Sequence, residues 1–279
     1  MKKIVCTLAL VASLAGAAEA QIRTPGASPS ATVIQGVGLQ KVTIDYSRPA
    51  LKGRKMFGDQ VPYGKVWRTG ANMAPKMTVD GEVTIAGKTV PAGTYGLFTI
   101  PGENEWTIIL SKKAQQFGAF DYKESDDLMR FTVKPEKLGK SEEFFTIEFT
   151  DFTPTASDVA IRWENAQVKF RIKTDPDAQI MAQLQAELAK PDVKTGVYSA
   201  AANYYFDTNR DMKQAREWAD KVVAADKKYW TYFLRGKIAA KQGDCQTARA
   251  DAEAGLKMAQ EAGDDAYIKN HKGILATCR

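Results

Sequence analysis

Histidine and cysteine are scarce in this 279-residue sequence. It has one histidine, His271, and three cysteines, none of which lies within residues 35–174. Nucleophile systems of the Ser-His-Asp or Cys-His type need an imidazole, and His-ligated zinc sites need several. These chemistries are therefore excluded from residues 35–174. We expect no metal and no other cofactor, and we interpret His271 as a polar residue of a short helix.

Phosphate-binding glycine loops of the GxGxxG and GxxxxGK[ST] types are also missing. Carboxylates are therefore the remaining acid–base candidates. They are Asp59, Asp121, Glu124, Asp126, Asp127, Glu142, Glu143 and Glu164. A glycosidase needs two carboxyl groups across a cleft. The adjacent pairs fall in expected loops, where exposure to solvent explains them without catalysis.

Long apolar runs are absent except at the N-terminus. Residues 1–20 read MKKIVCTLALVASLAGAAEA, with two lysines, a short apolar run and a closing Ala18-Glu19-Ala20. This pattern is typical of a secretory signal peptide, and the run is too short for a stable membrane-spanning helix. We predict cleavage near Ala20 and an exported protein, periplasmic or secreted, with no transmembrane segment in the mature chain.

Alternating apolar and polar residues dominate from residue 37 to about residue 172. The clearest stretches are 41–46, 82–85, 130–134, 158–163 and 167–172. Each is typical of a strand with one buried face, and Gly- and Pro-containing turns separate them. We predict an antiparallel β-sandwich or barrel over 35–174. The small and turn-forming residues of 21–34 predict a flexible lead-in before it.

The period changes to that of a helix after residue 175. The sequence DMKQA at 211–215 recurs as DCQTA at 244–248, thirty-three positions later. Small residues at a period near 34 are typical of tetratricopeptide-like helix pairs. We predict a helical-repeat tail over 177–279, so the whole chain is a multidomain α+β protein.

Two cysteines, Cys245 and Cys278, remain after the predicted cleavage. In an exported protein an even pair usually forms a disulfide. On the expected helices Cys245 begins the second helix of a repeat and Cys278 ends the last helix. Antiparallel neighbours would bring these ends together, so we predict a Cys245–Cys278 disulfide.

Basic residues gather in one segment of a chain whose formal net charge is +6. Residues 46–76 hold seven Lys or Arg against one acid, Asp59. A general nucleic-acid binder would spread its bases more widely, so we expect no nucleic-acid partner. The donors of this segment could converge on a carboxylate, sulfate or phosphate by fork geometry. The predicted ligand-binding residues are Arg48, Arg54, Arg68 and Asn72. The open alternative is that these arginines bind loop carbonyls and sheet carboxylates.

Three long runs of the sequence resemble a known family. They are YSRPALKGRKMFG, VPYGKVWRTGAN and VTIAGKTVPAGTYGLFTIPGENEWTIIL. They closely resemble exported Bacteroidetes proteins of the domain-of-unknown-function 2911 family, over roughly residues 30–172. The downstream helices resemble the tetratricopeptide-like tail of many members. The resemblance implies a Bacteroidetes-type source and an exported β-rich domain, and it implies no activity, catalytic residue or cofactor.

Two functions fit these observations. The first is an exported, non-enzymatic binding or scaffold module of the cell envelope, whose β-domain contacts a polar or anionic ligand and whose helical tail docks a protein. Its expected partner is an unidentified envelope protein or glycan. The alternative is a histidine-independent, carboxylate-based hydrolase or lyase acting on an envelope polymer. An enzyme needs a concave site where a carboxylate meets the cationic donors.

Overall fold

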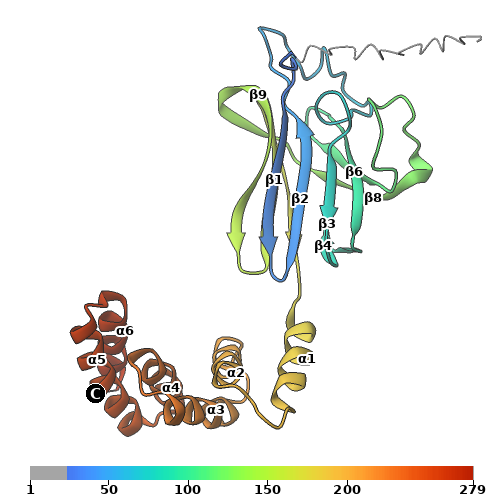
Figure 1. Ribbon diagram of the computed structural model, residues 1–279. Helices are drawn as coiled ribbons and strands as arrows, with labels where there is room; N and C mark the ends of the chain where they lie inside the picture. The colour runs from blue at the N-terminus through green and yellow to red at the C-terminus, as the bar shows by residue number, and fades with distance from the viewer. Residues whose placement is uncertain (1–23, 279) are drawn as a thin grey trace, which may run out of the picture. The chain divides into compact units, whose positions relative to one another are not determined.

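The computed structural model describes residues 24–278, and the chain divides after Asp175 into a β unit and a helical unit (Figure 1). The predicted signal peptide, 1–20, and its cleavage point lie outside the described residues. Each unit has its own buried core, and each is described by itself below.

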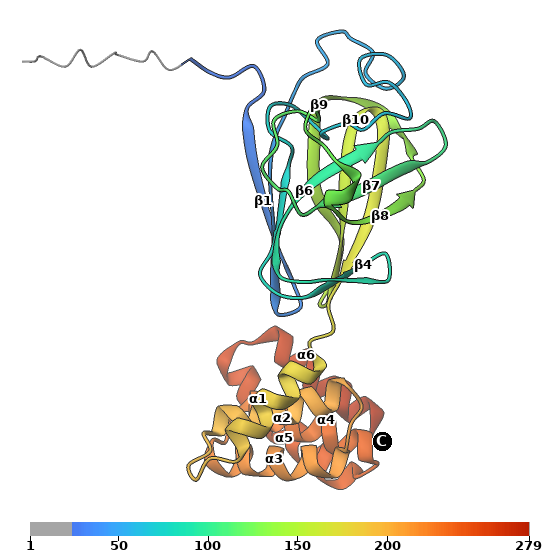
Figure 2. The ribbon, with the colours of Figure 1, turned by 90° about the vertical axis from the view of Figure 1, so that its right-hand side faces the viewer.

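The β unit consists of two antiparallel sheets, seen from a second side in Figure 2. The six-stranded sheet has, in spatial order, β1 (Ser30–Val37), β2 (Gln40–Ser47), β3 (Lys76–Val79), β6 (Gly93–Ile100), β7 (Trp106–Ser111) and β8 (Asp127–Val133). The four-stranded sheet has β5 (Lys88–Val90), β4 (Val83–Ile85), β10 (Ala156–Lys173) and β9 (Glu136–Thr153). The predicted antiparallel β architecture is confirmed, as two separate sheets.

The alternating pattern places one face of each sheet in a shared core. Val42 and Ile44 of β2 are fully buried, as are Val159 and Ile161 of β10. All four belong to the same apolar cluster, and burying such a side chain contributes about 1.5–3 kcal/mol. The hydroxyl of Tyr46 also donates to the carbonyl of Ile147 at 3.0 Å, which joins β2 to β9.

Strand β10 is longer than the sequence predicts. We expected separate strands over 158–163 and 167–172, but one strand runs through both. Glu164, between them, has a φ of 55°, and the register with β9 shifts on both sides of it. Such a β-bulge bends a strand and re-aims its side chains without ending it.

Strand β1 begins at Ser30, inside the segment that we expected to be a flexible lead-in. Residues 30–34 are strand, and β1 pairs with β2 from Ser30 opposite Ser47 to Val37 opposite Gln40. Up to Gly36 its residues alternate between exposed and half-buried, Ile34 is 61% exposed, and Val37 at the end of the strand is fully buried. An edge strand of this kind gives a weak sequence pattern because only one of its neighbours is a strand.

The helical unit contains α1 (Asp177–Leu188), α2 (Thr195–Asp207), α3 (Met212–Ala225), α4 (Tyr229–Gln242), α5 (Cys245–Ala262) and α6 (Asp265–Thr277). The repeated sequence positions have the same structural roles. Asp211 caps the start of α3 and Asp244 caps the start of α5, each accepting from backbone N–H groups. Ala215 and Ala248 are fully buried. Within residues 24–278, none of the helices has the length and apolar character needed to cross a bilayer.

A disulfide joins α5 to the end of α6. Cys245 and Cys278 are bonded, with their Cα atoms 5.1 Å apart, so the predicted pairing is confirmed. The bond closes a loop with a sequence separation of 33, and such a cross-link stabilises a fold by roughly 2–4 kcal/mol. Disulfides persist in oxidising compartments, and this one fits an exported protein.

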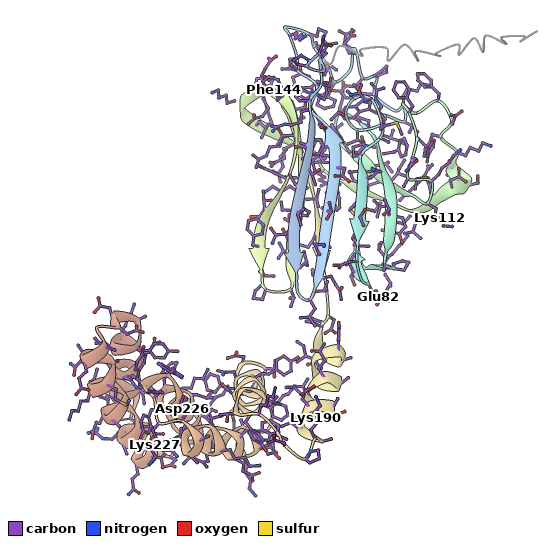
Figure 3. All side chains as sticks on the ribbon, viewed as in Figure 1. Glu82, Lys112, Phe144, Lys190, Asp226 and Lys227 are labelled. Carbon is purple, nitrogen blue, oxygen red and sulfur yellow. A yellow bond between two sulfur atoms is a disulfide. The ribbon has the colours of Figure 1, made fainter. Side chains whose placement is uncertain are left out.

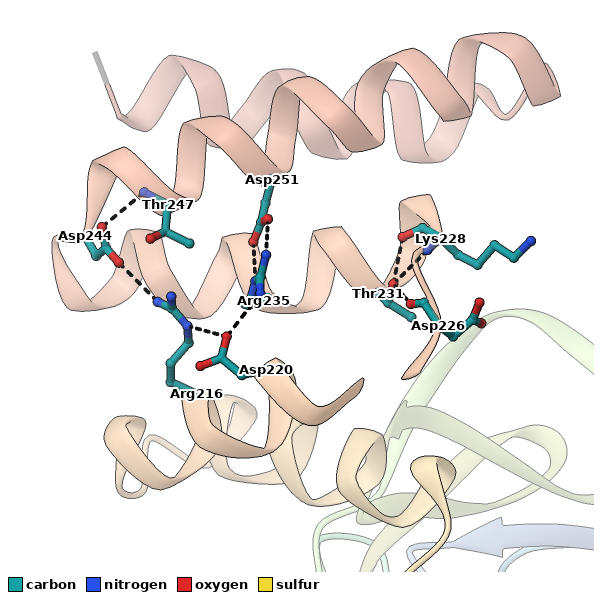
Figure 4. A network of polar contacts seen from close by, with 9 residues as sticks. All are labelled: Arg216, Asp220, Asp226, Lys228, Thr231, Arg235, Asp244, Thr247 and Asp251. Carbon is teal, nitrogen blue, oxygen red and sulfur yellow. Dashed lines mark hydrogen bonds and ion pairs between the residues drawn. The ribbon is translucent and has the colours of Figure 1, made fainter. Parts of the chain in front are cut away.

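An ion-pair network links α3, α4 and α5 (Figure 4). Arg235 of α4 donates to both carboxylate oxygens of Asp251, at 2.8 and 2.7 Å, and to Asp220 at 3.2 Å. Arg216 of α3 pairs with Asp220 and Asp244, each at 3.2 Å. Asp251 is 3% exposed, so its bidentate pair with Arg235 is shielded from water.

The histidine of the chain is buried within the helical unit. His271 has no exposed surface, and its Nε2 donates to the carbonyl of Tyr229 at 3.0 Å. Its Nδ1 is buried without a hydrogen-bond partner. Gly255 makes room for the ring, because a Cβ there would lie 2.2 Å from His271 Cε1. Burial lowers the pKa of His271, against smaller opposing effects of the Tyr229 carbonyl and Asp251.

This burial predicts that the helical unit becomes less stable as the pH falls below about 6.5, the ordinary histidine pKa. Below that pH the unfolded chain binds a proton that the folded unit resists, so the unfolding free energy decreases with falling pH until the folded pKa is reached. The slope is up to about 1.4 kcal/mol per pH unit. Urea unfolding followed by helical circular dichroism between pH 5 and 8 measures it. The variant His271→Gln should flatten this part of the curve, and an unchanged slope would refute the assignment.

Candidate functional site

The basic segment forms the connection between β2 and β3. Residues 48–75 lie across one end of the two sheets, where Figures 1 and 2 draw them in light blue. Phe144, labelled in Figure 3, lies at the same end and Glu82 at the opposite end. The segment is held in place because Trp67 and Thr99 exchange backbone hydrogen bonds of 2.7 and 3.0 Å.

An aromatic cluster anchors the segment to the core. The rings of Trp67 and Trp163 stack with centroids 5.9 Å apart and planes at 11°. Phe57 and Phe145 meet these rings edge-on, with centroids 5.5–6.3 Å apart. Each such pair adds about 0.5–1.5 kcal/mol beyond burial. The cluster therefore fixes the backbone around Trp67 and its neighbour Arg68.

Two of the candidate carboxylates hold the backbone of this segment. Glu164, aimed by the bulge in β10, accepts from the N–H groups of Met56 and Phe57, both at 3.1 Å. Glu143 accepts from the N–H of Lys52 at 2.9 Å. These carboxylates thus accept from backbone N–H groups of the irregular loop that would otherwise need another partner.

A cavity of about 460 Å³ opens beneath the segment. Its walls come from the lead-in, the basic segment and β10: Ala27, Ser28, Pro49, Ala50, Lys52, Arg54, Met56, Gln60, Val61, Trp67, Arg68, Gly70, Ala71 and Trp163. The volume is in the range of small-ligand sites. The three charged residues of the lining are cationic, and no Asp or Glu is among these described wall residues.

Arg68 has no internal partner in this cavity. Its Nε is buried and makes no hydrogen bond, and within the described residues Arg68 forms no ion pair. Burial lowers the pKa of Arg68 from its ordinary value. Burying a cation is costly unless an anion or acceptor compensates it. An anion in the cavity would supply that missing partner.

The turn after Arg68 has an unusual backbone. Thr69 and Asn72 have φ values of 58° and 59°, and Gly70 has a φ of 133°. A Cβ on Gly70 would lie 3.2 Å from the carbonyl oxygen of Ser47, so a side chain is disfavoured there on two grounds. Non-glycine residues in the left-handed region are uncommon and gather at functional sites.

The structure brings two of the four predicted ligand-binding residues to this cavity. Arg68 and Arg54 line it, although Arg54 already donates to the carbonyls of Ala50 and Leu51, at 2.8 and 2.9 Å. Arg48 instead binds strand β9, donating to the Phe145 carbonyl at 3.3 Å and to the Thr146 hydroxyl at 2.7 Å.

Asn72, the fourth, donates to the Ser47 hydroxyl at 3.2 Å and is not a wall residue. Arg48 and Asn72 thus hold the segment to neighbouring strands. Arg54, which binds two loop carbonyls, has part of the alternative role that the sequence left open for these arginines.

Other wall residues were not predicted. Ser28 and Gln60 were not recognised from the sequence, because no sequence pattern indicates that the lead-in and the basic segment line the same cavity. Lys52 was counted only as one of the bases, and its ammonium group is a further cation at the cavity. Trp163 is 2% exposed and belongs to the core, yet it also forms part of the cavity wall.

A second cavity, of about 340 Å³, gathers carboxylates on the β unit. Glu103, Glu136 and Glu164 line it together with Tyr63. Burial and then the charges of Glu103 and Glu164 raise the pKa of Tyr63. Glu164 is bound to the backbone as above, and Glu136 accepts from Gln167 Nε2 at 2.7 Å. Over residues 24–278, no group of three or more His, Cys, Asp and Glu side chains has the arrangement of a metal site.

Comparison with known proteins gives one match. The family model "Protein of unknown function (DUF2911)" matches residues 28–172. The chain belongs to the DUF2911 family. None of the curated proteins and none of the solved structures matches it. The match spans the wall residues of both cavities described above except Ala27, and it ends before the helices of this DUF2911 protein begin.

Proposed function

We propose that this DUF2911 protein is an exported, non-enzymatic binding module of the cell envelope. Its β unit holds an anionic ligand in the cavity at Arg68, and its helical unit docks a protein. The proposal includes a signal peptide cleaved near Ala20, residence in the periplasm or outside the cell, and a Bacteroidetes-type source. It also includes a tetratricopeptide-like relationship of the helices.

The observation that carries the proposal is the half-buried Arg68, whose guanidinium has a buried and unpartnered Nε. Its Nε lacks a partner, and Lys52 and Arg54 line the same cavity. A planar guanidinium with a free edge suits a carboxylate, sulfate or phosphate. Trp67 and Trp163 add apolar surface for the rest of the ligand. The combination favours a ligand with an anionic group on a ring, as in an acidic envelope glycan.

The hydrolase alternative has less support from this geometry. It needs a carboxylate free to exchange protons beside the bound substrate. Glu143 and Glu164, the candidates that contact the basic segment, both accept backbone hydrogen bonds from it. Asp59 lies in the segment itself but is exposed and is not a wall residue of the cavity. Asp127 likewise accepts from Arg130 and from the hydroxyl of Tyr122. These carboxylates have structural partners, whereas Arg68 has none.

A titration with an acidic sugar tests the proposal. We expect oligogalacturonate to change the tryptophan fluorescence of the full chain, because Trp67 and Trp163 line the cavity, and neutral maltooligosaccharide to have a much smaller effect. Arg68→Gln should lower the affinity for oligogalacturonate at least about tenfold, which corresponds to about 1.4 kcal/mol of binding free energy. The matched control is Lys65→Gln, an exposed base of the same segment that is not a wall residue.

The stability of each variant separates binding from scaffolding. Arg48→Gln removes hydrogen bonds to β9, so it should lower the melting temperature and leave the sugar response intact. Equal responses to the charged and neutral sugars would contradict the proposal. So would an Arg68→Gln variant that melts much earlier but responds like the wild type, because Arg68 would then serve the fold.

A further inference from the structure

A groove on the helical unit carries cations and aromatic rings. Its volume is about 620 Å³, and its walls come from α2, α4 and α6. Three lysines line it: Lys237 and Lys241 of α4 and Lys269 of α6. Phe206 and Phe233 supply rings, and no Asp or Glu is among these described wall residues. The i, i+4 spacing of Phe233, Lys237 and Lys241 places them along one face of α4.

Two of the lysines are already held in place. The Nζ of Lys237 lies 4.4 Å from the ring centroid of Phe206 and donates to Asn203 Oδ1 at 2.8 Å. The Nζ of Lys241 lies 4.8 Å from the Phe206 centroid and donates to the Phe206 carbonyl at 3.4 Å. A ligand would therefore meet ammonium groups whose positions need little further ordering.

The lysines of the groove lack the carboxylate partners that cations elsewhere in this unit have. Arg216 and Arg235 form ion pairs with aspartates on the side drawn in Figure 4. Within residues 24–278, none of the groove lysines forms an ion pair. Burial lowers the pKa of the half-buried Lys237, and the negative charge of Asp207 opposes this only in part. Lys241 and Lys269 are exposed, so the groove is a positive surface open to a partner, with no acidic residue among its described wall residues.

We propose that this groove binds an acidic segment of a partner protein, with carboxylates at the lysines and apolar side chains on Phe206 and Phe233. The inference rests on the proposed protein-docking role of the helical unit and names the chemistry of the partner. Charge complementarity identifies the occupant, because three lysines in a groove whose described walls hold no Asp or Glu attract a segment rich in Asp or Glu. Lysine is a point charge that accepts carboxylates from many directions, which suits an irregular peptide.

Fluorescence anisotropy with the full chain tests this proposal. The probe is a labelled short peptide of glutamates interrupted by leucines, and its partner probe replaces every glutamate by glutamine. We expect the glutamate peptide to bind and the glutamine peptide to bind at least about tenfold more weakly. The double variant Lys241→Glu/Lys269→Glu should lose at least about tenfold in affinity, because it places two like charges against the peptide.

The matched control is Lys213→Glu/Lys257→Glu. It makes the same change in net charge at exposed positions of α3 and α5, outside the groove. It should retain affinity within about twofold, since screening at physiological salt weakens charges more than about 8 Å away. Equal losses in both double variants, or equal binding of both peptides, would overturn the proposal. Binding to anionic lipid vesicles in place of the peptide would overturn it as well.

The two ligand sites are tested independently. Arg68→Gln lies in the β unit and should leave peptide affinity unchanged, whereas the groove variant should keep the response to oligogalacturonate. If the peptide fails to bind while the sugar response persists, only the acidic-segment proposal fails. If both ligands fail, the proposed function fails for both units.

Discussion

The variant Asp251→Ala is expected to lower the unfolding free energy of the helical unit by about 3–5 kcal/mol. Asp251 of α5 is 3% exposed and forms a bidentate pair with Arg235 of α4. Removing the carboxylate leaves the guanidinium of Arg235, whose side chain is 22% exposed, with only Asp220, at 3.2 Å, as its anionic partner. Breaking a buried pair from one side has a cost of this size, because the remaining charge stays desolvated.

Urea unfolding followed by helical circular dichroism measures the effect. The control is Glu253→Ala on the same helix, which breaks a pair with Arg249 at 3.5 Å. The side chains of that pair are about half exposed, so the expected loss is below about 1 kcal/mol. Similar losses of unfolding free energy in both variants would show that the Asp251–Arg235 pair contributes no more to stability than the exposed pair. The double variant Asp251→Leu/Arg235→Met should recover part of the stability, since no buried charge then lacks a partner.

The sheets and helices followed from the sequence because burial imposes a period. In β2 the buried residues Val42, Ile44 and Tyr46 alternate with polar ones. In the helical unit Asp211 and Asp244 recur at one offset because each caps an equivalent helix. The disulfide followed from the same repeat. These features depend on residues close in sequence, so a pattern reveals them.

Features that depend on irregular backbone did not follow. Glu164 adopts a left-handed conformation inside β10, and the bulge interrupts the alternation where the chain continues as one strand. The sequence therefore indicated two strands. Strand β1 was missed because its apolar residues do not share one buried face: Ile34 is 61% exposed, and up to Gly36 the inward positions are only half-buried.

The sequence indicated which segment holds the candidate site, but it did not indicate which side chains of that segment line the cavity. Arg48 and Arg68 look alike in the sequence, since each follows a buried aromatic side chain within two positions. Strand β9, about 97 residues further along the chain, provides the acceptors that engage Arg48. No acceptor meets the Nε of Arg68. Which guanidinium stays free is thus decided by distant strands, and no local pattern encodes it.

The variant Trp163→Ala is expected to lower the unfolding free energy of the β unit by about 3–5 kcal/mol. Trp163 packs against Trp67, Phe57 and Phe145, and its indole N–H donates to the Glu143 carbonyl at 3.3 Å. Alanine would leave a void beside the existing cavity, and the surrounding sheets relax only partly into such a space. Thermal and urea unfolding of the full chain measure the loss.

The control Phe120→Ala removes an aromatic side chain that is 84% exposed, so it should change the stability by less than about 0.5 kcal/mol. Trp163→Phe keeps a ring in the cluster but loses the indole hydrogen bond, and we expect an intermediate cost. A loss below about 1 kcal/mol for Trp163→Ala would contradict the assigned role. Because Trp163 belongs both to the core and to the cavity wall, Trp163→Phe should also lower the affinity for oligogalacturonate while the protein stays folded. An unchanged affinity in that variant would show that Trp163 does not contribute to ligand binding. The binding proposal would then rest on the cationic residues.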